Sequence, residues 1–122
     1  MISIIIPTYN GGALLQKSLL TWAKQTIDDS LYEVIVVDNN SIEDIPSAVN
    51  AVIENVGRSS WNVKNMFEGK PGATNARHAG AKVSKGDILV FADNDGLYPS
   101  ADGYRRKCGR TNLWSYHSRF SA

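Results

Sequence analysis

Three short runs of mainly β-branched apolar residues, each followed by a polar cluster, constrain the fold of this chain more than any other feature. The runs are residues 2–6 (ISIII), 34–37 (VIVV) and 88–92 (ILVFA). Because they do not alternate with polar residues, we expect strands that are buried on both faces, as in a parallel sheet. A weaker run at 62–67 predicts a further short strand.

Helical patterns separate the predicted strands. The first begins after Gly12, and a second, short helix is expected over residues 47–55. A third, rich in small residues, is expected to open at Pro71 and Gly72 and to close at Gly86. Strands and helices that alternate in this way predict an α/β layered fold with a mostly parallel sheet, whose ligands bind beyond the carboxyl ends of the strands.

Composition narrows the class of protein. With 13 basic and 12 acidic residues the net charge is +1, so neither nucleic acid nor an anionic membrane surface is an expected partner. Cys108 is the single cysteine, which supports neither a disulfide framework nor a structural zinc site. No signal-peptide pattern opens the chain, and no apolar run reaches the roughly 20 residues of a transmembrane segment. We expect a cytoplasmic protein, with peripheral contact at the cytoplasmic membrane face at most.

The first run is followed by Pro7, Thr8, Tyr9 and Asn10. We expect the proline to stop the strand and the next residues to turn into the ligand crevice, where the tyrosine ring can stack on a base. An ordinary polar loop between strand and helix is the alternative interpretation.

The second run is followed by Asp38, Asn39, Asn40 and Ser41. A carboxylate and two amides at a strand end can read a base edge or a ribose hydroxyl through hydrogen bonds. The same residue types are also the favoured caps of a helix N-terminus, so capping alone accounts for them equally well.

The third run is followed by Asp93, Asn94 and Asp95. Two carboxylates this close repel each other unless a cation joins them, and a hard divalent ion that also binds a diphosphate would neutralise both acids and the leaving group. An acidic turn without a ligand is the alternative.

Taken in order, SIIIPTYN, VIVVDNNS and KPGATNARHAGAKVSKGDILVFADND closely resemble the donor-binding half of family 2 glycosyltransferases. The third segment holds two motifs, a helix with Ala76 and Arg77 and the strand that ends in Asp-x-Asp, so there are four motifs in all. Each is common by itself, but four in this order on the predicted elements are specific to the family. The resemblance covers residues 1–95 and implies the GT-A fold, the three-layer, Rossmann-like α/β fold of nucleotide-diphospho-sugar transferases. The sequence departs mildly from the family at His78, where asparagine is common, while Asn94 occupies a variable middle position.

The resemblance also implies roles for individual residues. It places Thr8 and Tyr9 in the wall of the nucleotide pocket and Asp38 at the base, usually uracil. Arg77 matches a helix arginine that supports the donor site, and its planar fork suits a phosphate. Asp95 falls where the family usually coordinates a divalent ion, so Mn²⁺ or Mg²⁺ is the implied cofactor. The residues predicted to bind the nucleotide sugar are Pro7, Thr8, Tyr9, Asp38, Asn40, Gly72, Arg77 and Asp93, and those predicted to bind the metal are Asp93 and Asp95.

The charge balance of the chain changes at Gly96. Residues 1–95 hold 8 basic and 11 acidic residues, whereas residues 96–122 hold 5 basic residues and a single acid, Asp102. Inverting family members need an Asp or Glu as general base beyond the Asp-x-Asp motif, and an isolated loop acid such as Asp102 is a poor candidate. We therefore predict a nucleotide-sugar-binding half-domain over 1–95, with the fold incomplete at its C-terminus, and an atypical basic tail over 96–122 that is out of frame or disordered. No catalytic residue is identified.

The predicted function is metal-dependent, inverting transfer of a sugar from a nucleoside-diphosphate sugar, UDP-linked by preference, to a saccharide or lipid-linked acceptor, with only the donor-binding part present here. The alternative is a catalytically inactive remnant or a nucleotide-binding or interaction module, which the missing base favours. A receiver-like signalling domain is a weaker alternative, because receivers carry an acidic pair where this chain has Pro7, Thr8 and Tyr9.

Overall fold

A five-stranded sheet forms the centre of the protein. The computed structural model describes residues 1–94, residue 96 and the backbone of residues 113–116. The strand order is β3-β2-β1-β4-β5, in which β1 to β4 run parallel and β5 is antiparallel to β4. The strands are β1 (Ile2–Thr8), β2 (Tyr32–Asp38), β3 (Val63–Phe67), β4 (Ile88–Ala92) and β5 (Leu113–Tyr116).

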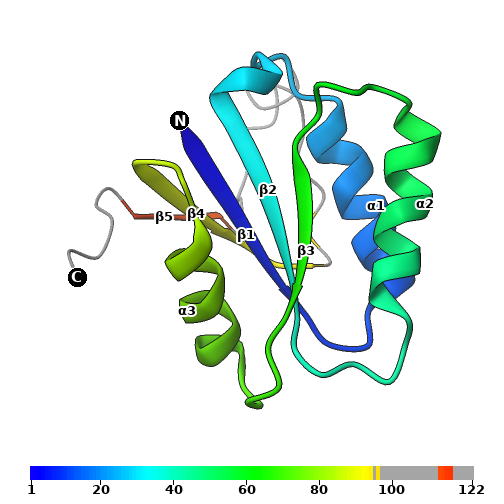
Figure 1. The fold of residues 1–122 in the computed structure, drawn as a ribbon, viewed down its shortest axis with the longest axis vertical. Helices are drawn as coiled ribbons and strands as arrows, with labels where there is room; N and C mark the ends of the chain where they lie inside the picture. The colour runs from blue at the N-terminus through cyan, green and yellow to red at the C-terminus, as the bar shows by residue number, and fades with distance from the viewer. Residues whose placement is uncertain (95, 97–112, 117–122) are drawn as a thin grey trace.

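Helices cover both faces of the sheet, so the fold has three layers (Figure 1). α1 (Gly12–Ala23) and α2 (Ile45–Val56) pack on one face, and α3 (Ala73–Val83) packs on the other. A 3-10 turn, η1 (Asp29–Leu31), precedes β2. The layered α/β arrangement with a mostly parallel sheet confirms the predicted fold class. Among the helices that the structure describes, none combines the length and the apolar character of a membrane span.

The apolar runs of the sequence are explained by burial on both faces of β1 and β2. Successive side chains of a strand point to opposite faces, so a strand covered on both sides needs apolar residues at every position. All seven residues of β2 are buried. The core under α1 and α2 contains Ile4, Ile6, Val34 and Val36, and the core under α3 contains Ile5, Ile35 and Val37.

Pro7 does not end β1, contrary to the sequence prediction, because the strand continues through it to Thr8 in register with β2. The carbonyl of Thr8 accepts the main-chain N–H of Asn39, on the β2 side. Main-chain groups of neighbouring strand residues point to opposite sides, so Pro7 faces β4. The pairing of β1 with β4 has already ended at Ile5, and the missing N–H of proline therefore breaks no ladder bond.

The start of α2 also differs from the prediction. The helix begins at Ile45, and its N-cap is Asp44, whose Oδ1 accepts the main-chain N–H of Ser47 at 3.2 Å. The polar cluster after β2 is therefore not the helix cap. Instead, the Oδ1 of Asp38 accepts the N–H of Ser41 at 2.9 Å and closes a tight turn.

Gly86 does not close α3 as predicted, because the helix already ends at Val83. Its role is close packing against the start of β1: a Cβ at this position would lie 2.6 Å from the Oγ of Ser3 and 2.8 Å from the carbonyl of Met1. The N–H of Gly86 donates to the same Ser3 Oγ at 2.8 Å. The segment after α3 is thereby fixed to the amino-terminal edge of the sheet.

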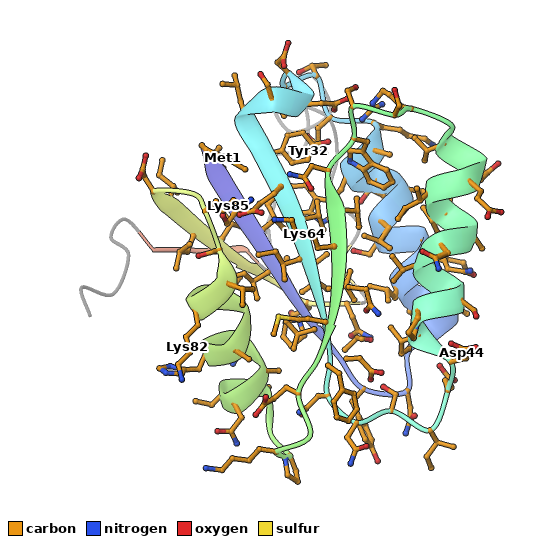
Figure 2. All side chains as sticks on the ribbon, in the orientation of Figure 1. Met1, Tyr32, Asp44, Lys64, Lys82 and Lys85 are labelled. Carbon is orange, nitrogen blue, oxygen red and sulfur yellow. The ribbon has the colours of Figure 1, made fainter. Side chains whose placement is uncertain are left out.

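A buried carboxylate, Glu33, ties the amino-terminal edge together. Its Oε2 accepts the hydroxyl of Ser3 and the N–H of Lys85, each at 2.6 Å, and its Oε1 lies 3.0 Å from the Nζ of Lys64. Lys64 and Lys85 lie at the same end of the sheet as Met1 (Figure 2). Burial alone raises the pKa of Glu33, but these hydrogen bonds outweigh it and hold the pKa below its ordinary value of 4.5.

We expect Gly80→Ala to destabilise the protein. A Cβ at Gly80 would lie 2.5 Å from the Cγ2 of Ile5 and 3.1 Å from the Cγ2 of Val37. Helix propensity favours alanine by about 1 kcal/mol, but overpacking a core costs about 1–3 kcal/mol, so a net loss of about 1 kcal/mol is expected in urea denaturation. Lys82→Ala, an exposed change on the same helix, is the control. A gain in stability for Gly80→Ala would contradict the close contact of α3 with the sheet.

Glu33 should also make stability depend on pH. Because its pKa is lowered by folding, its stabilisation is fully present above the ordinary value of 4.5 and is lost as the pH falls through the folded-state pKa. Urea denaturation of wild type and Glu33→Gln should show the largest stability difference near neutral pH and a shrinking difference in acid. Glu54→Gln, at an exposed position of α2, is the control. A constant difference at every pH would contradict the ionised, hydrogen-bonded state of Glu33.

Candidate functional site

The polar clusters that follow the strands meet at the carboxyl-terminal edge of the sheet. β1 and β2 end in register, with Thr8 opposite Asp38. The N–H of Glu68, just after β3, donates to the carbonyl of Asp38 at 2.8 Å. Figure 1 shows the loops after β1, β2 and β3 at one end of the sheet. The parallel topology therefore brings motifs from distant parts of the sequence together, as the alternating pattern predicts.

Two adjoining cavities open at this edge and share Tyr9, Asn39 and Ala73 in their walls. The first encloses about 240 Å³ and the second about 430 Å³. The first is lined by Pro7, Thr8, Tyr9, Asn39, Ala73, Arg77, Asp93 and Asn94, and the second by Tyr9, Asn39, Asn40, Pro71, Gly72 and Ala73. Seven of the residues predicted from the sequence thus line one continuous hollow, while Asp95 lies outside the described residues.

Asp38 is the predicted residue that lines neither cavity. Its side chain is buried, and its Oδ1 closes the turn to Ser41. This turn presents Asn39 and Asn40 to the wider cavity, and Asn40 adopts a left-handed φ of 60°. Asparagine tolerates that conformation better than most residues, which accounts for an amide at this position.

Asn39 is a site residue that the sequence analysis did not select. It is 7% exposed, and its Nδ2 donates to the carbonyls of Glu68 at 3.0 Å and Lys70 at 2.8 Å. Its Oδ1 accepts the N–H of Gly72 at 3.0 Å. One amide therefore fixes the whole loop from β3 to α3, and with it the start of α3. The only signal in the sequence was its place beside two other hydrogen-bonding residues, which a turn also explains.

Tyr9 stands on a loop that is braced from the side. Its neighbour Asn10 has a φ of 52°, and the Oδ1 of Asn10 accepts the N–H of Ile42 at 2.7 Å. In return, the N–H of Asn10 donates to the Oγ of Ser41 at 2.9 Å. The loops after β1 and β2 are therefore joined, and Tyr9 remains 63% exposed beside the cavities. The main chain that carries the ring is thus held in place, and an exposed ring beside a cavity can stack on a flat ligand.

Opposite charges line the smaller cavity. Arg77 comes from the second turn of α3, and Asp93 follows β4. Within residues 1–94 the Arg77 guanidinium forms no ion pair. A partly exposed guanidinium beside a polar hollow can bind the oxygens of a phosphate in a bidentate manner. His78, next in the chain, is exposed on α3.

The described residues offer a divalent ion one carboxylate in this hollow, that of Asp93. No group of three or more His, Cys, Asp or Glu side chains suited to a metal occurs among them. Small hard cations such as Mg²⁺ are commonly held by one or two carboxylates together with substrate phosphates. Asp93 is one such carboxylate, and a bound phosphate would have to supply further oxygen ligands.

Comparison with known proteins identifies relatives. The family model described as Glycosyl transferase family 2 matches residues 3–102. Validoxylamine A glucosyltransferase of Streptomyces hygroscopicus subsp. limoneus is 32% identical over 95 residues, which are 76% of this chain and 20% of that protein. Glycosyltransferase AglE of Haloferax volcanii is 35% identical over 95 residues, which are 77% of this chain and 30% of that protein. The chain therefore spans less than a third of the length of these relatives.

Solved structures share the fold. A mannosyltransferase from Pyrobaculum calidifontis in complex with GDP-Man and Mn²⁺ superposes with a TM-score of 0.75 at 29% identity, covering 83% of this chain and 29% of that one. TarS of S. aureus in complex with UDP gives a TM-score of 0.72 at 25% identity, covering 88% of this chain and 31% of that one. With its fold shared by these two proteins and a family match that extends over nearly all of its described residues, the chain belongs to glycosyltransferase family 2.

Proposed function

We propose that this chain binds a nucleoside-diphosphate sugar at the carboxyl-terminal edge of its sheet and forms the donor-binding part of a glycosyltransferase. One observation carries this: the exposed ring of Tyr9, the guanidinium of Arg77 and the carboxylate of Asp93 line a single cavity. A nucleoside diphosphate offers a flat base and an anionic diphosphate, which match these groups in kind.

The two cavities suggest how the donor lies. The base fits the wider cavity, where Tyr9 supplies a stacking surface and Asn39 and Asn40 form a polar wall. Asp38 then acts through the turn that presents both asparagines. The diphosphate fits the smaller cavity, where Arg77 meets its negative charge. Gly72 lines the wider cavity, and its φ of 115° lets the main chain approach the ligand closely there.

A divalent ion, Mn²⁺ or Mg²⁺, would be held by Asp93 and Asp95 and would supply neutralisation of the diphosphate leaving group. The Pyrobaculum calidifontis neighbour was solved with Mn²⁺ and GDP-Man, which supports a metal-dependent donor site. The complex of TarS with UDP supports a UDP-linked donor as the first to test. We further propose transfer with inversion to a saccharide or lipid-linked acceptor.

A nucleotide-binding module without turnover is a second candidate function. Among the described residues that line the two cavities, Asp93 is the sole carboxylate. If Asp93 serves the metal, a general base for the acceptor hydroxyl must come from elsewhere. Asp102, the acid considered for that role from the sequence, lies outside the described residues. Donor binding without transfer in an assay with soluble acceptors would favour this second candidate.

Isothermal titration with UDP and Mn²⁺ tests the proposed donor site. The chain should bind UDP weakly, and Arg77→Ala should reduce the affinity roughly tenfold or more, because a charge-assisted hydrogen bond contributes about 1.5–3 kcal/mol. Asp93→Asn should remove the effect of Mn²⁺. The matched control is Lys82→Ala, which removes an exposed positive charge from the same helix. The absence of binding to UDP, GDP and other nucleoside diphosphates would exclude the proposed function.

Asn39→Ala tests the bracing of the site. Loss of three hydrogen bonds to main-chain groups should lower the free energy of unfolding by about 2–3 kcal/mol, at roughly 1 kcal/mol per bond. Amide hydrogen exchange should accelerate in residues 68–73, which Asn39 holds. UDP affinity should fall because Pro71, Gly72 and Ala73 line the wider cavity. Asn50→Ala, at an exposed site of α2, is the control. Unchanged exchange in the loop would show that Asn39 does not fix it.

A further inference from the structure

Asn94, between the two acids of the Asp-x-Asp motif, is bonded to the end of β1. Its Nδ2 donates to the Oγ1 of Thr8 at 3.0 Å. Thr8 is only 2% exposed, so its hydroxyl has little access to water and the amide of Asn94 supplies a partner for it. The sequence resemblance treats this middle position as variable. In this chain the side chain there has a defined contact with a residue of the first motif.

Gly11 leaves the space that this contact needs. A Cβ at Gly11 would lie 2.2 Å from the Nδ2 of Asn94 and 3.8 Å from the Oγ1 of Thr8. The φ of Gly11 is −121°, a value that any residue adopts, so its backbone conformation does not require glycine. The constraint comes from Asn94: its amide is the end of a flexible side chain and would have to leave Thr8 to make room for a Cβ. Thr8 and Gly11 together form a slot for Asn94.

Among the described residues, the β1–β4 ladder does not reach the segment after β4. The ladder between β1 and β4 ends at Ile5 and Phe91, before either strand reaches its polar cluster. Between Thr8 and the segment after β4, the Asn94 side chain therefore makes a link that the sheet does not make. Asp93, its neighbour in the chain, lines the smaller cavity together with Thr8. The position of the Asp93 carboxylate depends on where this segment is anchored.

We propose that Asn94 is a positioning residue of the donor site: held in the slot of Thr8 and Gly11, it fixes the start of the segment after β4 against β1 and sets the carboxylate of Asp93 for a nucleotide-bound divalent ion. This inference rests on the proposed donor binding at the same cavity. Groups that orient a metal ligand without touching the metal commonly contribute 10–100-fold to metal affinity, so loss of the slot should be measurable.

A double-mutant cycle without ligand tests the slot. Gly11→Ala should lower the urea midpoint of the wild-type chain by a small, measurable amount, because the new methyl group displaces the Asn94 amide from its hydrogen bond with Thr8. In an Asn94→Ala background the same change has room and should have almost no effect. Additive losses in the two backgrounds would overturn the slot. Thr8→Val, which keeps the shape but removes the acceptor, provides a second variant if Gly11→Ala does not fold.

The positioning role is tested by titrating UDP with and without Mn²⁺. In wild type, Mn²⁺ should raise the affinity for UDP. Asn94→Ala and Thr8→Val should each reduce that metal-dependent gain roughly tenfold and change the affinity for UDP alone far less. Thr8→Ser keeps the hydroxyl and should preserve the gain, as should the control Asn55→Ala at an exposed site of α2.

The outcomes separate the two proposals. If wild type binds UDP with a gain from Mn²⁺ and Asn94→Ala keeps that gain, the positioning role is wrong and the donor site stands. If the variants lose affinity for UDP alone to the same extent, Asn94 serves the fold and not the metal, and the inference is again wrong. If wild type binds no nucleoside diphosphate under either condition, both proposals fail together.

Discussion

The parallel pairing of β1 with β2 holds the other parts of the structure in place. The two strands pair over their whole lengths, from Ile2 opposite Tyr32 to Thr8 opposite Asp38. Both are covered by helices on each face, so a shift of one residue in either strand would exchange its two cores and place side chains of the wrong size against α1 and α3. The register is thus fixed by burial on both sides. Because it is fixed, two polar clusters that are distant in the sequence end side by side.

Beyond the ends of the strands, hydrogen bonds of asparagine side chains, in place of the main-chain ladder, hold neighbouring segments together. Asn10 joins the loops after β1 and β2, Asn39 joins β2 to the loop before α3, and Asn94 joins the segment after β4 to Thr8. An amide has both donors and acceptors, so it can satisfy a carbonyl and an N–H with one side chain. A carboxylate in place of Asn39 would face two carbonyl oxygens, those of Glu68 and Lys70, with no proton to donate. The polar groups at this edge therefore form a frame for the cavities.

The apolar runs predict β1, β2 and β4 and the edge that carries the site, because burial of β-branched residues is a strong and local signal, and a weaker run predicts β3. The three layers were implied by the family resemblance, and β5 lies in the tail, for which no strand was predicted. Prediction from the sequence was less accurate where the cause lies in contacts between distant segments. The sequence predicts that Pro7 ends β1. In the structure the β1–β4 ladder has already ended at Ile5, so the missing N–H of Pro7 breaks no hydrogen bond between these strands. The local pattern predicts that Gly86 ends α3, whereas in the structure glycine is needed because a Cβ there would lie 2.6 Å from the Oγ of Ser3. Such a reason cannot be found in the local pattern.

The same dependence on contacts between distant segments decides which residues of the candidate site could be predicted from the sequence. Thr8, Tyr9, Arg77 and Asp93 were selected from the sequence through a resemblance between motifs, and they do line one cavity. Asn39 is one of the two amides named after the second run, but nothing in the local pattern separates its role from that of Asn40, and a turn accounts for both. The three hydrogen bonds of Asn39 join it to residues that lie 29 to 33 positions further along the sequence. Only the register of the sheet decides which of the adjacent amides points to that loop.

The two ends of the strands differ in how their polar and charged groups are paired. At the amino-terminal edge the charge of Glu33 is buried and has partners from β1, β3 and the segment after α3. At the carboxyl-terminal edge Tyr9 stays exposed, and Arg77 has no ion pair within residues 1–94. An exposed ring and a cation without an internal partner add little to folding but are free to contact a ligand. Stability at one edge therefore allows the opposite edge to keep groups whose interactions, under the proposed function, a nucleotide would complete.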